Sequence, residues 1–204
     1  LQIRGLVAGG ADLIFIETQF DLAEARAAVA AARLECDLPV MVSMTFEQGV
    51  SLTGSSPMIF AETMQNMGVD VVGTNCSLGP DQMLPVVREL LAACKAAGLH
   101  TCVESSLCTP WPAVEQSLAD IDFVITDIKH MNPEKHRQFT GGNLSVVLNN
   151  IKRVCRSGKQ LIVRIPLIPR HNDDADNIRR TGRFLAAVRG PGLHAGELGF
   201  QRLG

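Results

Sequence analysis

The stretch "ADLIFIETQFDLAEARAAVAAARLECDLPVMVSMTF" (residues 11–46) decides the fold, because it switches between two hydrophobic periods. Its two ends, 11–18 and 40–46, are short apolar runs typical of buried strands. The segment between them, 21–34, carries apolar residues three and four positions apart and begins at Asp21, a residue type that caps helices. This order predicts two parallel strands joined by a right-handed helical crossover.

The same alternation runs along the rest of the chain. Further strands are expected at 69–77, 100–106, 122–129, 161–169 and 193–200, and two further helices at 56–68 and 80–98. Ser56 can cap the first of these helices, and Gly68 and Gly98 can end them in a left-handed conformation. We predict an α/β fold, a TIM-like parallel (βα) barrel with seven recognisable strands. Because a closed barrel has eight, either one strand is hidden, the barrel is open or incomplete, or another chain completes it. A doubly wound sheet is the alternative, although no G-x-G-x-x-G follows the first strand.

The composition narrows the classes of function. Nineteen Lys and Arg against 21 Asp and Glu give a net charge of −2, so we expect neither a nucleic acid nor an anionic membrane as a partner. No apolar stretch reaches the roughly 20 residues that span a bilayer, and no signal segment opens the chain, which predicts a cytoplasmic protein. The six cysteines include no C-x-x-C pair, and we expect reduced thiols. The chain starts at Leu1 in what reads as a helix, as if cut or assembled from something larger.

Polar residues gather where the predicted strands end, which is the edge at which parallel α/β proteins carry their chemistry. They are Glu17, Thr18, Thr45, Glu47, Asn75, Cys76, Glu104, Ser105, Asp127, Lys129 and Arg164. The alternative is that such residues only cap the following helices and contact water. Glu17, Asp127 and Arg164 favour a site more strongly, because each interrupts an otherwise apolar run.

The cysteines and histidines give a weaker metal signal. Cys76 follows an apolar run, but a catalytic zinc needs about three protein ligands, and a free cysteine is often a small buried hydrophobe. His130 and His136 are six residues apart in "HMNPEKH" and fit no i, i+4 ligand pair, so we expect them on a solvated face. We expect no role for Cys102 and Cys108.

Residues 1–90 resemble the homocysteine-binding barrel of cobalamin-dependent methionine synthase. The resemblance is carried by "GGADLIFIETQFDLAEARAAV", "LPVMVSMTFEQGVSLTG" and "GVDVVGTNCSLGPDQM". In that family a zinc ion binds the homocysteine thiol and lowers its pKa, so that the thiolate attacks a methyl group. The resemblance implies that Cys76 is the first zinc ligand and that Glu17 and Asn75 line the amino-acid pocket. The family's other two zinc ligands form a Cys-Cys pair, and this chain contains none.

Residues 91–204 resemble the activating enzymes of glycyl-radical enzymes, which are radical S-adenosylmethionine (SAM) proteins of the pyruvate formate-lyase activating type. The resemblance is carried by "LLAACKAAGLHTCVESSL", "DFVITDIKHMNPEKHRQFTG", "LIVRIPLIPRHNDDADNI" and a degraded "GELGFQRLG". It implies that SAM is surrounded by the residues Glu104, Ser105, Asp127, Lys129 and Arg164. The family binds its iron–sulfur cluster through C-x-x-x-C-x-x-C, and this chain has no such motif.

The two resemblances meet within a helix, where a join preserves the helical period. We therefore predict a single hybrid (βα)-barrel domain over residues 1–204, with no complete active site and with zinc or SAM binding at most as a vestige. One alternative is an enzyme or binding protein of the radical SAM activase lineage that still holds SAM or another small metabolite. Another is homocysteine binding through zinc at Cys76. A third is a homo-oligomer in which a second copy completes the barrel, since unpaired strand edges invite pairing.

Overall fold

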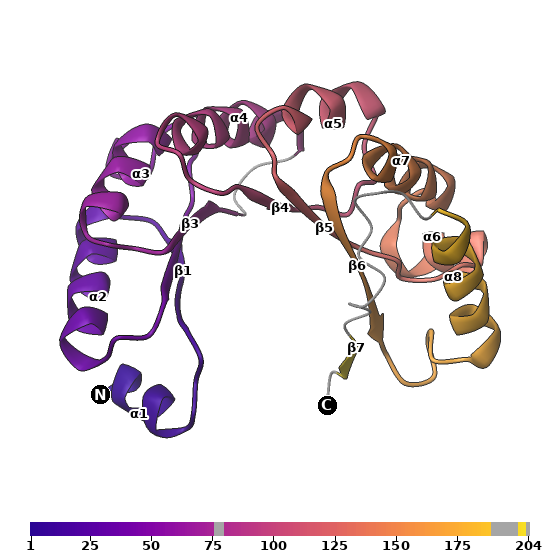
Figure 1. Cartoon of the computed structure of the whole chain (residues 1–204), viewed down its shortest axis with the longest axis horizontal. Coiled ribbons are helices and arrows are strands. Elements are labelled where there is room, and N and C mark those ends of the chain that lie inside the picture. Colours follow the sequence, from indigo (N-terminus) through magenta and orange to yellow (C-terminus); the bar gives the residue numbers. More distant parts are fainter. Residues whose placement is uncertain (76–79, 189–199, 203–204) are drawn as a thin grey trace. The chain divides into compact units, whose positions relative to one another are not determined.

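The computed structural model describes residues 1–75, 80–188 and 200–202, and it divides into two compact units, Leu1–Leu99 and His100–Gly204. Each unit is a parallel sheet with helices packed against it, as Figure 1 shows for each half of the chain. The parallel α/β class is thus confirmed. Closure of the strands into a barrel stays a prediction, because the described strands form two sheets, β1–β2–β3 and β4–β5–β6–β7.

The first unit contains the elements that the opening stretch predicts. In chain order these are α1 (Gln2–Ala8), β1 (Ile14–Gln19), α2 (Leu22–Glu35), β2 (Val40–Met44), α3 (Pro57–Asn66), β3 (Val71–Thr74) and α4 (Pro80–Ala96). The strands pair in parallel in the order β1–β2–β3. The side-chain oxygens of Asp21 and Ser56 accept from the first-turn amides of α2 and α3, which confirms both predicted caps.

The core of the first unit lies between the sheet and the helices α2, α3 and α4. Val40, Val42 and Met44 of β2 are fully buried and pack with Phe60 and Met64 of α3. These alternate positions of β2 face the helices, so that the strand contributes large apolar side chains to one side of the sheet. Figure 1 shows α2 and α3 running along this sheet.

The second unit has the same alternation of strands and helices as the first, with two helices between its second and third strands. Its elements are β4 (Cys102–Glu104), α5 (Trp111–Leu118), β5 (Phe123–Asp127), α6 (Pro133–Thr140), α7 (Leu144–Arg156), β6 (Gln160–Leu167), α8 (Ala175–Ala187) and β7 (Phe200–Arg202). All four strands are parallel. The strand predicted at 193–200 falls mostly outside the described residues, and only Phe200 is shared with β7.

Helix α7 supplies much of the core of the second unit. It buries Val147, Ile151 and Val154 at helical spacing, and it contacts β6, whose Leu161 and Val163 are also buried. In the part of the chain that the structure describes, no helix is both long and apolar enough to cross a membrane.

Candidate functional site

A charged cluster lies at the carboxyl ends of β4 and β5 and on the neighbouring part of β6. Asp127 is paired with Arg164 in the β5–β6 register, and Glu104 is the last residue of β4. Arg164 Nε donates to Asp127 Oδ1 at 2.8 Å, and its Nη2 lies 3.3 Å from Asp127 Oδ2 and also donates to Glu104 Oε1. One guanidinium therefore bridges two carboxylates from two different strands.

Lys129 adds a second cation to this cluster, since its Nζ donates to Asp127 Oδ2 at 2.6 Å. The side chain of Asp127 is only 17% exposed, whereas that of Glu104 is 60% exposed. Asp127 is thus the enclosed centre of the cluster and Glu104 its open edge. Two cations balance two carboxylates, so the cluster carries no net charge when all four are ionised.

The pKa values of the cluster follow from this geometry. Burial raises the pKa of Asp127, but the hydrogen bonds from Arg164 and Lys129 outweigh it and hold that pKa below its usual range. The hydrogen bonds to Asp127 and Glu104 raise the pKa of the Arg164 guanidinium. Asp127 is therefore a carboxylate near neutral pH, which makes it a binding group rather than a proton donor.

A cavity of about 350 Å³ opens beside the cluster. Its wall is formed by Glu104, Ser105, Ser106, Cys108, Asp127, Lys129, His136, Thr140, Gly142 and Val147. The volume falls within the range of about 300–1,000 Å³ that small-molecule sites occupy. Carboxylates, an ammonium group, hydroxyls, a thiol and an imidazole all reach this space, so a polar metabolite suits it better than an apolar one.

The loop after β4 is held in place by two polar contacts. Leu107 has a φ of 51°, an unusual conformation for a side chain of its size, and its amide donates to Ser105 Oγ at 3.1 Å. The buried Asn150 of α7 donates from Nδ2 to the carbonyls of Leu107 and Thr109 at 2.9 and 2.8 Å. This anchoring fixes Cys108, which lies between those two carbonyls, at the cavity wall.

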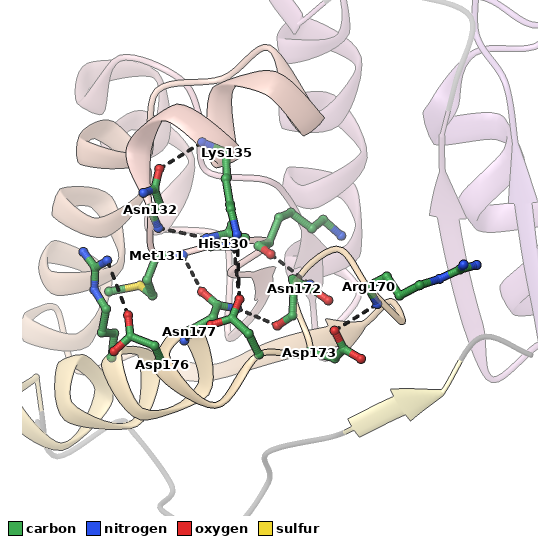
Figure 2. A network of polar contacts seen from close by, with 12 residues as sticks. His130, Met131, Asn132, Lys135, Arg170, Asn172, Asp173, Asp176 and Asn177 are labelled. Atoms are coloured by element: carbon green, nitrogen blue, oxygen red, sulfur yellow. Dashed lines mark hydrogen bonds and ion pairs between the residues drawn. The ribbon is translucent and has the colours of Figure 1, made fainter.

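The loop after β5 is held by a network of buried amides, shown in Figure 2. Asn172 donates from Nδ2 to the carbonyls of Lys129 and Pro166 at 2.9 and 2.7 Å. Asn177 of α8 accepts from the Met131 amide at 2.7 Å and donates to the Asn172 carbonyl at 2.8 Å. The backbone that carries Lys129 is thereby tied to both β6 and α8.

The first unit brings Asn75 to the end of β1. Its Nδ2 donates to Thr18 Oγ1 at 2.8 Å, while its Oδ1 is buried and has no partner among the described residues. Thr18 has a φ of 55° where the β1–β2 register shifts, and its amide donates to Ser43 Oγ at 2.8 Å. Glu17 lies next to Thr18 on β1 and is exposed. An orphan acceptor at this strand end is suited to a ligand that donates a hydrogen bond.

Cys76, the predicted zinc ligand, lies outside the described residues. Among the residues that are described, no three His, Cys, Asp or Glu side chains lie close enough to hold a metal ion. The role of Cys76 stays a prediction.

The prediction of solvated histidines is wrong. His130 and His136 are each only 3% exposed. His136 is the buried residue of α6, and the ring of His130 packs against Phe139 of the same helix. Cys108, His136 and Thr140 also line the cavity, and none of them was predicted as a site residue from the sequence. The only signal available was their position after a strand end or on a short polar helix, which does not show that they meet.

The parallel sheets and the polar residues at their carboxyl ends define a class of α/β protein that carries its site at the strand ends. The chain belongs to the homocysteine S-methyltransferase family, whose model matches residues 1–135. This match extends past residue 90, where the sequence predicts the change of resemblance, and into the second unit.

The chain is also similar to activating enzymes. It is 40% identical over 119 residues to the (2S)-3-sulfopropanediol dehydratase activating enzyme of Klebsiella oxytoca. These residues make up 58% of this chain and 38% of that protein. It is 27% identical over 178 residues to the indoleacetate decarboxylase activating enzyme of Tractidigestivibacter scatoligenes, covering 83% of this chain and 56% of that protein. The chain therefore spans 38% and 56% of the lengths of these two relatives.

Solved structures agree with the similarity to activating enzymes and with the α/β fold. A domain of the pyruvate-formate lyase-activating enzyme from Bacteroides vulgatus matches with a TM-score of 0.52 and 25% identity, covering 62% of this chain and 83% of that one. The tryptophan synthase complex from Pyrococcus furiosus matches with a TM-score of 0.50 at 13% identity over 94% of this chain and 79% of that one, a likeness of fold alone. The predicted hybrid of two kinds of protein is confirmed at the level of similarity.

Proposed function

We propose that this chain is a hybrid scaffold whose second unit holds a SAM-type ligand without cleaving it. The proposal rests on the Arg164–Asp127–Lys129 cluster, of which Asp127 and Lys129 line the 350 Å³ cavity. The cluster lies at the strand ends that the resemblance to radical SAM activating enzymes assigns to SAM.

The chemistry of the wall fits the amino-acid part of such a ligand. Asp127 and Glu104 are carboxylates that can accept from an ammonium group, and Lys129 and the hydroxyls of Ser105 and Ser106 can donate to a carboxylate or a ribose. Asp127 and Arg164 are already paired, so the ligand would meet groups in fixed orientations.

We propose binding of SAM without its reductive cleavage. The resemblance implies a [4Fe–4S] cluster held by three cysteines in C-x-x-x-C-x-x-C, and the six cysteines of these 204 residues do not have that spacing. The residues present can bind and orient a ligand through hydrogen bonds and charge, which requires no redox group.

The test is a thermal-shift titration of the full chain with SAM. We expect a concentration-dependent rise in the melting temperature that is lost in Glu104→Gln. The matched control is Glu115→Gln, because Glu115 is an exposed residue of α5 in the same unit and should leave the shift intact. A SAM shift that survives in Glu104→Gln and in Asp127→Ala would contradict the proposed site.

A second candidate function is supported by the orphan Oδ1 of Asn75. We propose that this end of the first unit retains the amino-acid pocket of a homocysteine-binding protein, with Glu17 and Asn75 as its contacts and with zinc at Cys76. Homocysteine should raise the melting temperature when zinc is present, and Asn75→Leu should abolish the rise. A zinc-dependent rise that is unchanged in both Asn75→Leu and Cys76→Ser would reject this pocket.

The finer fold prediction, an incomplete (βα) barrel over residues 1–204, also remains a proposal, and so does its completion by a second copy. The mass of the full chain in solution tests the second part. A monomer at micromolar concentration would rule out completion by self-association.

A further inference from the structure

A thiol and an imidazole both lie beside Gly142 on the wall of the cavity. Gly142, in the turn between α6 and α7, has no side chain, and a Cβ placed on it would lie 2.9 Å from Cys108 Sγ, 3.2 Å from Thr140 Oγ1 and 3.6 Å from His136 Nε2. One small group at that point would thus touch both the sulfur and the ring nitrogen. The absence of a side chain at Gly142 keeps this space open.

His136 is suited to act as a base. The residue is only 3% exposed, and its Nδ1 is buried with no hydrogen-bond partner in residues 1–75, 80–188 and 200–202. Burial lowers the pKa of His136, and the backbone of His130 only partly opposes this effect. The imidazole is therefore neutral at neutral pH, when one of its ring nitrogens can accept a proton.

Cys108 has a hydrogen-bond donor directed at its sulfur. The amide of Asn143, the residue that caps α7, donates to Cys108 Sγ at 3.3 Å. Such a donor at the start of a helix stabilises negative charge on the sulfur as it develops. Cys108 is half-buried and lines the cavity.

The charges around the cavity restrict what can approach the thiol. Glu104 and Asp127 are matched by Lys129, which lines the cavity, and by Arg164, which is bonded to both carboxylates. A wall with both signs of charge and several hydroxyls complements a zwitterion better than a molecule with net charge.

We propose that Cys108 is a reactive thiol that undergoes exchange with zwitterionic amino-acid disulfides, with His136 as its general base. His136 takes the thiol proton, and Cys108 Sγ attacks one sulfur of the incoming disulfide. A bond forms between Sγ and that sulfur, the original S–S bond breaks, and the leaving thiolate takes up the proton from His136. The incoming disulfide is the oxidant, and the bound half remains in the cavity. The bound half would also block a SAM-type ligand, a consequence that rests on the proposed function.

Cys102 provides an internal comparison. It is more exposed than Cys108, but burial of its thiol and the nearby Glu104 raise its pKa. If exposure alone decided reactivity, Cys102 would react first. The thiol–imidazole pair predicts the reverse order.

The experiment incubates the full chain with homocystine and follows each cysteine by peptide mass spectrometry. We expect Cys108 to be modified at least tenfold faster than Cys102. Gly142→Ala should slow modification of Cys108 about tenfold, because the added Cβ would meet its sulfur, and should leave Cys102 unchanged. Gly182→Ala is the matched control, since a Cβ there meets no atom within 4 Å, and it should change neither rate.

The role of His136 is tested by the pH dependence of the rate. In the wild type the rate of Cys108 modification should show an inflection below about pH 6.5, which His136→Gln should remove. Among the described residues, Glu104, Cys108, Asp127 and Lys129 line the cavity together with the imidazole, and His130 interacts with it electrostatically. A Lys129→Gln variant should keep the inflection.

Equal rates at Cys108 and Cys102, or a Gly142→Ala variant that reacts at the wild-type rate, would overturn the proposal. A chain that shows no SAM shift before modification would reject the proposed function alone, because the labelling rates do not depend on SAM.

Discussion

Asp127 accepts two hydrogen bonds from Arg164, at 2.8 Å from Nε and 3.3 Å from Nη2, across paired positions of two parallel strands. The pairing places a cation beside the least exposed carboxylate of the site, so the pair is both a structural contact and the fixed part of the candidate pocket. Its strength can be measured without knowing the ligand.

Asp127→Asn should lower the free energy of unfolding at pH 7 by about 1.5–3 kcal/mol, the range for hydrogen bonds to charged groups. Because the folded-state pKa of Asp127 is lowered, its contribution is complete above the unfolded pKa of about 3.9 and is lost as pH falls through the folded value. Urea unfolding at pH 7 and in steps below pH 4 should therefore show the variant and the wild type converging. A gap that widens in acid would contradict this.

The buried histidines should make the second unit sensitive to mild acid. Burial lowers the pKa of both His130 and His136, so the unfolded chain binds protons first, and stability is lost as pH falls below about 6.5 toward the folded values. The melting temperature should fall between pH 7 and 5, and less so in His130→Gln. His100→Gln, at an exposed position, should follow the wild type.

Asn177→Leu should destabilise the chain by about 1–3 kcal/mol, because it leaves the buried Met131 amide without an acceptor. The matched variant Asn149→Leu replaces an exposed asparagine of α7 and should change stability by less than about 0.5 kcal/mol. Denaturant midpoints measured side by side would decide the matter, and similar losses in both variants would show that the network does not matter.

Arg170→Gly should stabilise the chain by about 1 kcal/mol. Arg170 has a φ of 68°, a conformation that costs a residue with a side chain about 1–2 kcal/mol and glycine little. The same substitution in the exposed interior of α8, Arg179→Gly, should instead cost about 1 kcal/mol. Thermal unfolding of the two variants should give shifts of opposite sign, and a loss in Arg170→Gly would show that the arginine side chain matters more than its backbone.

Features set by neighbouring residues could be predicted from the sequence. The caps at Asp21 and Ser56 follow from side chains that reach amides two or three positions ahead. The meeting of Asp127 and Arg164 could be expected as well, because the carboxyl ends of parallel strands share an edge.

Features set by the path of a connection could not be predicted. Cys108 and His136 are 28 positions apart, and both lie beside Gly142 because the turn at Gly141 and Gly142 brings the end of α6 to the loop after β4. The burial of His130 depends on α6 and α8, whose packing leaves no periodic signal in "HMNPEKH". Hydrophobic patterns report which face of an element is covered, and a short polar helix carries little of that information.

The Met131 amide, which donates to the side chain of Asn177, offers a spectroscopic reporter. The Met131 N–H bonds to a side chain that is itself buried and held by the carbonyl of Asn172, so solvent reaches this proton only when α8 separates from the loop after β5. Its hydrogen–deuterium exchange should therefore be among the slowest in the second unit and should follow global opening. One resonance would then measure how often the helix detaches, in the presence or absence of any ligand.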